Sequence, residues 1–247
     1  MKRFLILLKN EGRLSLRDMN MPIFALAMPL IILTVLGMLY GRAEAAPGAP
    51  YTFLEQSFGA VCAVSMCAGG LMGLPMVVSD YRERKILKRF RVTPMSPALL
   101  LAVEVAMYML YCAASLALCA VAAVCFWGVR LPGHPAAFLG AWLLTMVSTL
   151  SIGMLVGGVA KDSRQAGVIA SILYFPMLVF SGTTLPLEVM PEAMRAVMRV
   201  FPLTQGIELM KRTFVGMQAP DALLPVAVML MVTAVCSGLS VRFFRWE

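Results

Sequence analysis

Long apolar runs separated by short polar segments form the main pattern along this chain. A transmembrane helix needs about 20 mostly apolar residues to cross the hydrocarbon core of a bilayer. Six runs approach or exceed this length, at residues 21–41, 57–79, 98–127, 137–160, 165–185 and 222–241. The pattern predicts an all-α integral membrane protein with six transmembrane helices, in which residues 1–247 form a single transmembrane domain.

Composition and charge placement support the membrane class. The chain is 60% hydrophobic and only 14% charged, whereas soluble domains carry about 25% charged residues. The formal net charge is +8, and most Lys and Arg residues lie in residues 1–20, in the second and fourth connections and at the C-terminus. Basic residues are enriched in cytoplasmic segments, so both termini are expected in the cytoplasm. The charge thus reports topology, and no nucleic-acid partner is expected.

The N-terminal segment, residues 1–20, mixes basic side chains with a partial apolar stripe. The stripe is interrupted by Glu11 and consists of Phe4, Leu7, Leu8 and Leu14. Basic amphipathic helices lie in the membrane interface, so this segment is expected to form an interfacial helix. A short basic anchor with no further role is the alternative interpretation.

The second connection, residues 80–97, predicts a short cytoplasmic helix. Asp80 and Glu83 have the spacing of a capping pair, Pro94 would stop the helix, and Ser96 would cap the third span. Such a helix, standing between two spans, would suit contact with a cytoplasmic partner. Its contact residues would be Arg82, Glu83, Arg84, Lys85, Leu87 and Phe90. An ordinary positive-inside loop is the alternative.

Residues 186–221, on the outer side, predict two short amphipathic helices between spans five and six. The first would begin at Pro191, shortly after Glu188, and end at Pro202, and the second would follow Thr204. Both could lie on the membrane or re-enter it, and re-entry is tolerated only where protein or a cavity receives the backbone. They could also serve only to cover the bundle.

Small residues and one carboxylate mark further positions within the spans. Gly69 with Gly73, and Gly153 with Gly157, repeat every four residues and predict faces of close helix contact. Glu104 lies about two turns into the third span. A charge in a bilayer costs about 3 kcal/mol or more, so Glu104 is expected to face protein or water or to reach the interface. A role in a polar pathway and a single structural hydrogen bond are both consistent with this position.

Several common nucleotide-binding and catalytic motifs are missing from the sequence. There is no P-loop of the form GxxxxGK[ST], and no HExxH or GxSxG motif. The single histidine, His134, lies in a short loop, and the six cysteines all lie within apolar runs without metal-ligand spacing. We therefore expect no catalytic residue, no metal and no cofactor in this chain.

Two segments resemble those of a known family. The string from Arg82-Glu83 through Leu87, Phe90 and Thr93-Pro94 to Ser96-Pro97 is similar to the cytoplasmic segment of ABC-2-type permeases. The stretches Ser181-Gly182, Leu185-Pro186-Leu187, Met190-Pro191 and Phe201-Pro202-Leu203-Thr204 are similar to the outer segment of the same family. Lys85, Ile86, Lys88 and Phe201 depart from the residues usual there, Lys85 standing where Gly is common.

The resemblance implies a function as well as a layout. It implies a multi-pass protein of the plasma (inner) membrane of a prokaryote, which dimerises as a homodimer or heterodimer. Two cytoplasmic ABC ATPase subunits would bind ATP and Mg and would contact the segment that includes residues 82–93. The chain would be the permease of an exporter for a hydrophobic or amphiphilic solute such as a drug, lipid or glycan. The alternatives are a non-transporting scaffold or immunity subunit that docks an ATPase, and an intramembrane enzyme, which a single Glu104 does not support.

Overall fold

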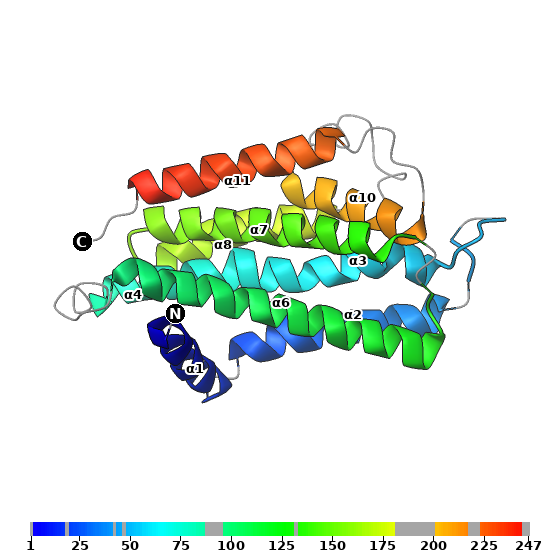
Figure 1. Ribbon diagram of the computed structural model, residues 1–247, viewed down its shortest axis with the longest axis horizontal. Helices are drawn as coiled ribbons and strands as arrows, with labels where there is room; N and C mark the ends of the chain where they lie inside the picture. Colours follow the sequence, from blue (N-terminus) through cyan, green and yellow to red (C-terminus); the bar gives the residue numbers. More distant parts are fainter. Residues whose placement is uncertain are drawn as a thin grey trace.

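Long helices lying side by side form the structure, which is a computed structural model (Figure 1). It describes residues 2–17, 20–41, 43–45, 48–86, 96–130, 133–180, 201–216 and 223–243. Within these ranges the regular structure is helical, apart from one isolated bridge between Glu44 and Thr52. The expectation of an all-α membrane protein is confirmed.

The helices follow the apolar runs closely. Their bounds are α1 Lys2–Arg17, α2 Asn20–Tyr40, α3 Phe53–Met66, the π-helix η1 Cys67–Gly73, α4 Leu74–Glu83, α6 Pro97–Trp127, α7 Pro135–Val159, α8 Ser163–Phe180, α10 Pro202–Val215 and α11 Leu223–Phe243.

Five stretches of the described residues are long and apolar enough to cross a membrane: Ile23–Tyr40, Phe53–Glu83, Ala98–Trp127, Pro135–Val159 and Leu223–Arg242. The expected span at 165–185 corresponds to α8 as far as Phe180, and its remainder lies outside the described residues. The number of six spans therefore stays a prediction.

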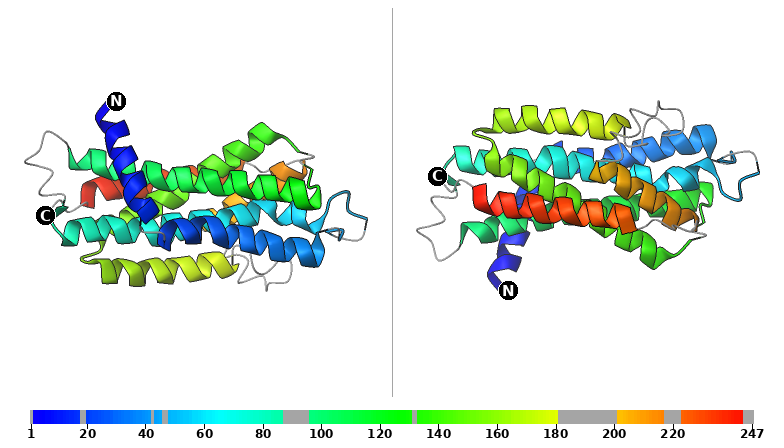
Figure 2. Two further views of the ribbon diagram at one scale, coloured as in Figure 1. Left: turned by 90° about the horizontal axis from the view of Figure 1, so that it is seen from below. Right: turned by 90° about the horizontal axis from the view of Figure 1, so that it is seen from above.

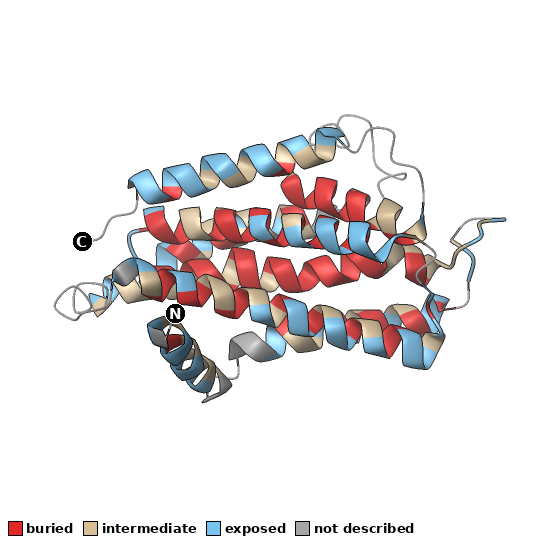
Figure 3. Ribbon diagram, viewed as in Figure 1, coloured by how far each residue is buried: buried red, intermediate tan, exposed pale blue. Residues whose placement is uncertain are grey.

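The centre of the bundle is the continuous helix α3–η1–α4 together with α7. In the most apolar windows of these spans 78% and 56% of the residues are buried, against 11% for α11 (Figure 3). The second span is thus surrounded by other helices, whereas most of the surface of α11 is exposed. An apolar helix with such an exposed surface suits contact with lipid.

A stretch of π-helix carries the central span past Pro75. Proline has no N–H, and its ring clashes with the carbonyl four residues earlier in a regular α-helix. In the wider η1 the N–H of Leu74 bonds to the carbonyl of Gly69, five residues back. The glycine-rich sequence Cys67-Ala68-Gly69-Gly70-Leu71-Met72-Gly73 allows this widening, so the helix continues to Glu83 without ending.

The first described helix, α1, and the last residues of α11 lie at the same end of the bundle, where α1 crosses it obliquely (Figure 1 and the left view of Figure 2). We call this the basic end, because its described cations include Arg82, Arg84, Lys85, Lys161, Arg164 and Arg242. α1 packs mainly on α6. Its Leu7 is buried, whereas Leu5 and Ile6 are exposed and free to face a membrane interface.

α10 enters the bundle from the opposite end. Gly206 lies against Thr145 of α7, ten residues or about 15 Å along that helix from its first residue. Phe214 packs on Phe138, near the first residue of α7. Figure 1 and the right view of Figure 2 show α10 beside α7 and α11. The second outer helix therefore re-enters the bundle, and protein on its buried face receives it.

Candidate functional site

The last turn of α4 lies at the basic end and carries two of the predicted contact residues, Arg82 and Glu83. The helix ends because Lys85 adopts φ 56°, a left-handed conformation uncommon for residues with a side chain. The N–H of Arg84 bonds to the carbonyl of Asp80, and that of Lys85 to the carbonyl of Arg82. Arg84 and Lys85 are exposed beyond this turn, which leaves two cations at the end of the central span.

Arg82 attaches the end of α4 to the end of α7. Its Nη1 donates to the carbonyls of Gly157, Gly158 and Ala160 at 3.2, 2.9 and 2.6 Å. The last carbonyls of a helix have no partner within it and carry its partial negative charge. Arg82 therefore acts as a C-terminal cap for α7 from 75 or more residues away in sequence.

Glu83 makes the complementary contact with the start of α8. Its Oε2 accepts hydrogen bonds from the N–H of Ser163 at 3.1 Å and from its hydroxyl at 2.8 Å. A carboxylate at a helix N-terminus satisfies free N–H groups and opposes the positive end of the dipole. Arg82 and Glu83 together hold both sides of the α7–α8 turn.

These contacts correct the predicted start of the short helix at 80–97, of which residues 87–95 lie outside the described residues. Asp80 and Glu83 do not cap the beginning of a new helix, because both lie in the last turn of α4, which continues from the central span. Asp80 instead pairs with Arg84 at 2.8 Å within that turn. Of the six predicted contact residues, Arg82 and Glu83 are engaged inside the chain, and Leu87 and Phe90 lie outside the described residues.

The predicted glycine faces lie at close contacts between helices. A Cβ added to Gly69 or Gly73 would lie 3.1 or 2.7 Å from the ring of Tyr108 of α6. A Cβ on Gly153 would lie 1.9 Å from the carbonyl oxygen of Gly70, and one on Gly157 would lie 2.8 Å from Cβ of Val78. The glycines let the central span approach α6 on one side and α7 on the other.

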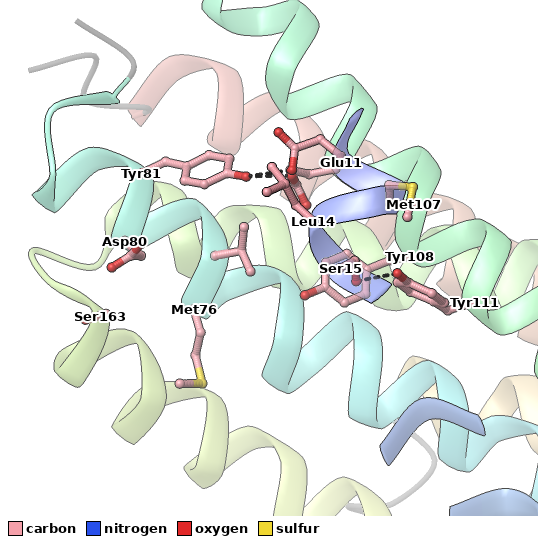
Figure 4. Close-up of a pocket in the computed structure, with 12 residues that line it drawn as sticks. Glu11, Leu14, Ser15, Met76, Asp80, Tyr81, Met107, Tyr108, Tyr111 and Ser163 are labelled. Atoms are coloured by element: carbon pink, nitrogen blue, oxygen red, sulfur yellow. Dashed lines mark hydrogen bonds between the residues drawn. The ribbon is translucent and has the colours of Figure 1, made fainter. Parts of the chain in front are cut away.

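A cavity of about 580 Å³ lies at the basic end between α1, α4 and α6, with Ser163 of α8 at its edge (Figure 4). Glu104 is buried there, and its Oε1 accepts a hydrogen bond of 2.8 Å from the hydroxyl of Tyr81. Glu11 of α1 lies 3.4 Å from the same hydroxyl through its Oε2. Tyr111 of α6 donates to Ser15 of α1, so two tyrosines hold α1 against the bundle.

Glu11 also has an altered acidity. Burial raises the pKa of its carboxyl above the usual value, and the hydrogen bonds from Tyr81 and with Glu104 act in the opposite direction. Desolvation disfavours the charged form of a carboxyl group. The position that interrupts the apolar stripe of α1 is thus the position turned toward the bundle.

Only part of the predicted outer segment, residues 186–221, lies within the described residues. α10 begins at Pro202, with Phe201 as its N-cap, so the second outer helix starts before Thr204 rather than after it. Thr204 is buried in the first turn. Glu208 pairs with Arg212 at 2.9 Å, and Gly216 ends the helix at φ 77°. Glu188, Pro191 and the first outer helix lie outside the described residues.

The sequence analysis missed a capping box at the opposite end. The side chain of Thr52 accepts from the N–H of Glu55 at 3.2 Å, and Oε2 of Glu55 accepts from the N–H of Thr52 at 2.8 Å. Oε1 of Glu55 also accepts from the N–H of Arg130 at 3.1 Å. Thr and Glu three residues apart before an apolar run form the signature of this motif. The second span therefore begins at Phe53, not at 57, and Glu55 joins Glu104 as a carboxylate within a span.

No group of three or more His, Cys, Asp or Glu side chains that could hold a metal occurs in the part of the chain that the structure describes. The basic end combines two exposed cations, the hydrogen bonds from α4 to α7 and α8, and an acidic cavity between α1, α4 and α6. These features, in a bundle of apolar helices, define a membrane protein whose central span links its interior to one polar face.

Comparison with known proteins gives the family. The model of the ABC-2 type transporter family matches residues 2–215. Because the match covers most of the chain, the chain belongs to the ABC-2 type transporter family.

Three curated relatives show more limited similarity. The chain is 29% identical to the inner membrane transport permease YhhJ of Escherichia coli (strain K12) over 82 residues, which are 33% of this chain and 22% of the relative. It is 27% identical to nodulation protein J of Neorhizobium galegae over 101 residues, 41% and 36% of the two chains. It is 23% identical to the probable multidrug ABC transporter permease YbhS of Escherichia coli (strain K12) over 178 residues, 72% and 47%. Each match spans less than half of the relative's length.

Proposed function

We propose that this chain is the permease subunit of an ATP-driven exporter that moves a hydrophobic or amphiphilic solute. Its ATPase would be a separate cytoplasmic subunit, which would bind ATP and Mg, and two permease chains would assemble into the working unit. The basic end would face the cytoplasm, in agreement with the placement of basic residues. Membership of the ABC-2 type transporter family over residues 2–215 is the observation that supports this proposal best.

The end of α4 is the part of the chain through which we expect an ATPase to act. Arg84 and Lys85 are exposed there, the side chain of Arg84 to 71%. Directly before them, Arg82 and Glu83 connect the central span to the end of α7 and the start of α8. A displacement of Arg84 and Lys85 by a bound partner would therefore move α4, α7 and α8 together, as coupling to an ATPase requires.

The test has two parts, docking and response. The tagged chain is purified from native membranes in mild detergent, and a nearly stoichiometric partner with a P-loop is expected. Reversing both charges, Arg84→Glu with Lys85→Glu, should remove most of the bound ATPase while the chain still inserts. Arg130→Glu, an exposed cation at the opposite end, is the matched control and should keep the partner.

The response then separates an exporter from a scaffold. In reconstituted vesicles, ATP hydrolysis by the complex should rise when an amphiphilic solute is added, and the solute should accumulate on the outer side. Binding of an ATPase whose activity ignores every solute tested would favour a scaffold or immunity subunit. Recovery of the chain alone, in a preparation that preserves such complexes, would contradict the proposal.

A further inference from the structure

The cavity beneath α1 has a lining that selects for one kind of ligand. Its walls come from helices far apart in the sequence. Figure 4 shows the hydroxyl of Tyr81 on α4 directed toward Glu11 on α1, and Ser15 on α1 beside Tyr111 on α6. Its volume of about 580 Å³ lies within the range of roughly 300–1,000 Å³ that is usual for small-molecule sites.

The lining is acidic. Glu11 and Glu104 both approach the hydroxyl of Tyr81, at 3.4 and 2.8 Å. A phenol carries one proton and can donate a full hydrogen bond to one carboxylate at a time. Two carboxylates around one donor repel each other when both are ionised, and a positive group between them would relieve that repulsion.

The two described arginines that follow Tyr81 have partners other than Glu11 and Glu104. Among the described residues that line the cavity none is Lys, Arg or His. Arg82, which follows Tyr81, donates to the carbonyls at the end of α7. Arg84 pairs with Asp80, so the third carboxylate of the lining has a partner of its own. Among the described residues the lining thus holds no cation for Glu11 and Glu104, and a cation that enters from outside could pair with them.

The rest of the lining is aromatic and apolar. Tyr108 and Tyr111 lie edge to face, with ring centroids 6.2 Å apart, and Tyr81 contributes a third ring. Tyrosine faces attract organic cations, an interaction that strengthens where water is excluded. Met76 and Met107 also line the space, and thioether side chains adapt to apolar groups of varied shape. A small hydrated metal ion would make no use of these surfaces.

We propose that this cavity binds an amphiphilic organic cation, with its positive centre at Glu11 and Glu104 and its apolar groups against the tyrosines and methionines. As a cargo site, this inference rests on the proposed export function, whereas binding itself does not depend on export. The position of the cavity at the basic end, beside the α4 turn, would let an occupant act on the residues expected to meet the ATPase.

Equilibrium binding of a labelled probe cation, tetraphenylphosphonium, tests the site. The full chain is reconstituted in nanodiscs of zwitterionic lipid, which offer the probe no net lipid charge. We expect saturable binding that triphenylphosphine oxide, a neutral compound with similar rings, competes for poorly. Glu104→Gln and Glu11→Gln should each weaken binding roughly tenfold or more, a change of about 1.4 kcal/mol. Glu44→Gln, an exposed carboxylate near the opposite end, is the matched control and should bind normally.

Aromatic variants provide a second readout. Tyr111→Phe retains the ring and should keep most of the affinity, whereas Tyr111→Leu removes the ring and should lose several-fold. Thermal unfolding checks that each variant is folded, and Glu11→Gln serves if Glu104→Gln does not fold. Absence of saturable binding to the folded wild type would overturn the site. So would wild-type affinity in both Glu11→Gln and Glu104→Gln. Displacement of the probe by micromolar magnesium or manganese would identify a metal site instead and would also overturn it.

The outcome is distinguishable from failure of the export function. Normal probe binding with no effect on ATP hydrolysis or accumulation would leave the site standing and would contradict the exporter. Solute-stimulated hydrolysis in a complex whose permease binds no cation would support the exporter and contradict the site.

Discussion

The guanidinium group of Arg82 lies 2.6 Å from the carbonyl oxygen of Ala160, although 78 residues separate them in the sequence. This contact joins the end of the central span to the end of α7. With Glu83 on Ser163 beside it, it makes the basic end of the bundle a unit in which α4 cannot shift without α7 and α8.

Replacing Arg82 with Ala should destabilise the bundle. The carbonyls that Arg82 caps would lose their donor, at a cost of about 1–3 kcal/mol. For a chain of this size each kcal/mol lowers the unfolding midpoint by roughly 2–4 °C, which a thermal scan in detergent would measure. Arg84→Ala, which removes an exposed pair worth about 0.3–0.5 kcal/mol, is the control. Equal midpoints for the two variants would show that Arg82 is not a structural cap.

Replacing Gly153 with Ala should separate the two central helices. The added Cβ would lie 1.9 Å from the carbonyl oxygen of Gly70 and 3.4 Å from Cδ of Pro75. Since backbone cannot move aside as a flexible side chain can, we expect a loss of about 1–3 kcal/mol or more. Gly140→Ala, on the same helix and with no atom within 4 Å of the added Cβ, should be neutral or stabilising by about 0.5–1 kcal/mol. A stable Gly153→Ala protein would mean that the helices are packed less closely.

Removing the capping box should weaken the opposite end of the central span. Thr52→Ala loses the acceptor for the N–H of Glu55, at a cost of about 0.5–2 kcal/mol. Glu55→Ala should cost more, because the N–H groups of Thr52 and Arg130 both lose an acceptor. Thr34→Ala offers a comparison, since that hydroxyl bonds only to the carbonyl of Leu30 within its own helix among the described contacts. Chemical denaturation in mixed micelles would rank the three.

Attachment of α1 should depend on pH. The pKa of Glu11 is raised in the folded chain from 4.5, so the folded state binds this proton more tightly than the unfolded state. Stability from this group is fully present at low pH and falls as the pH rises from about 4.5 through the raised value. Limited proteolysis of the N-terminal segment should therefore be faster at about pH 8 than at about pH 5.

Glu11→Gln should flatten this dependence, and Glu44→Gln should not. The titratable groups that line the cavity with Glu11 do not change in these variants. They are Asp80 and Tyr81 of α4 and Glu104, Tyr108 and Tyr111 of α6. A pH dependence that is unaltered in Glu11→Gln would assign the effect to another of these groups.

The apolar runs made most of the architecture predictable, because a transmembrane helix requires only a sufficient length of mostly apolar residues. The apolar runs that start at 98 and 137 located the spans that begin at Pro97 and Pro135 to within two residues. The start at Phe53 was missed by four residues because Thr52 and Glu55 were not recognised as a capping box. The second outer helix was expected to follow Thr204, whereas it begins at Pro202.

The contacts at the basic end could not have been read from the sequence. Arg82 and Glu83 were expected to face a partner, since an isolated basic stretch has the same pattern whether it is exposed or engaged. Their real partners at Ala160 and Ser163 depend on how α7 and α8 pack beside α4, which no local spacing encodes. Glu104 was expected to meet protein, water or the interface, and only the fold brings it to Tyr81 and Glu11.

The π-helix at Cys67–Gly73 sets the rotational phase of everything that follows it in the central span. Each residue of an α-helix turns the chain by about 100°, and a π turn holds one more residue than an α turn. If the same residues closed into a regular α-helix, the last turn of α4 would swing by roughly that angle. Tyr81 would leave the cavity, and Arg82 would leave the end of α7, although neither residue had been altered. The glycines of the π-helix thus determine which way Tyr81 and Arg82 face, although they lie two or more turns away within the central span.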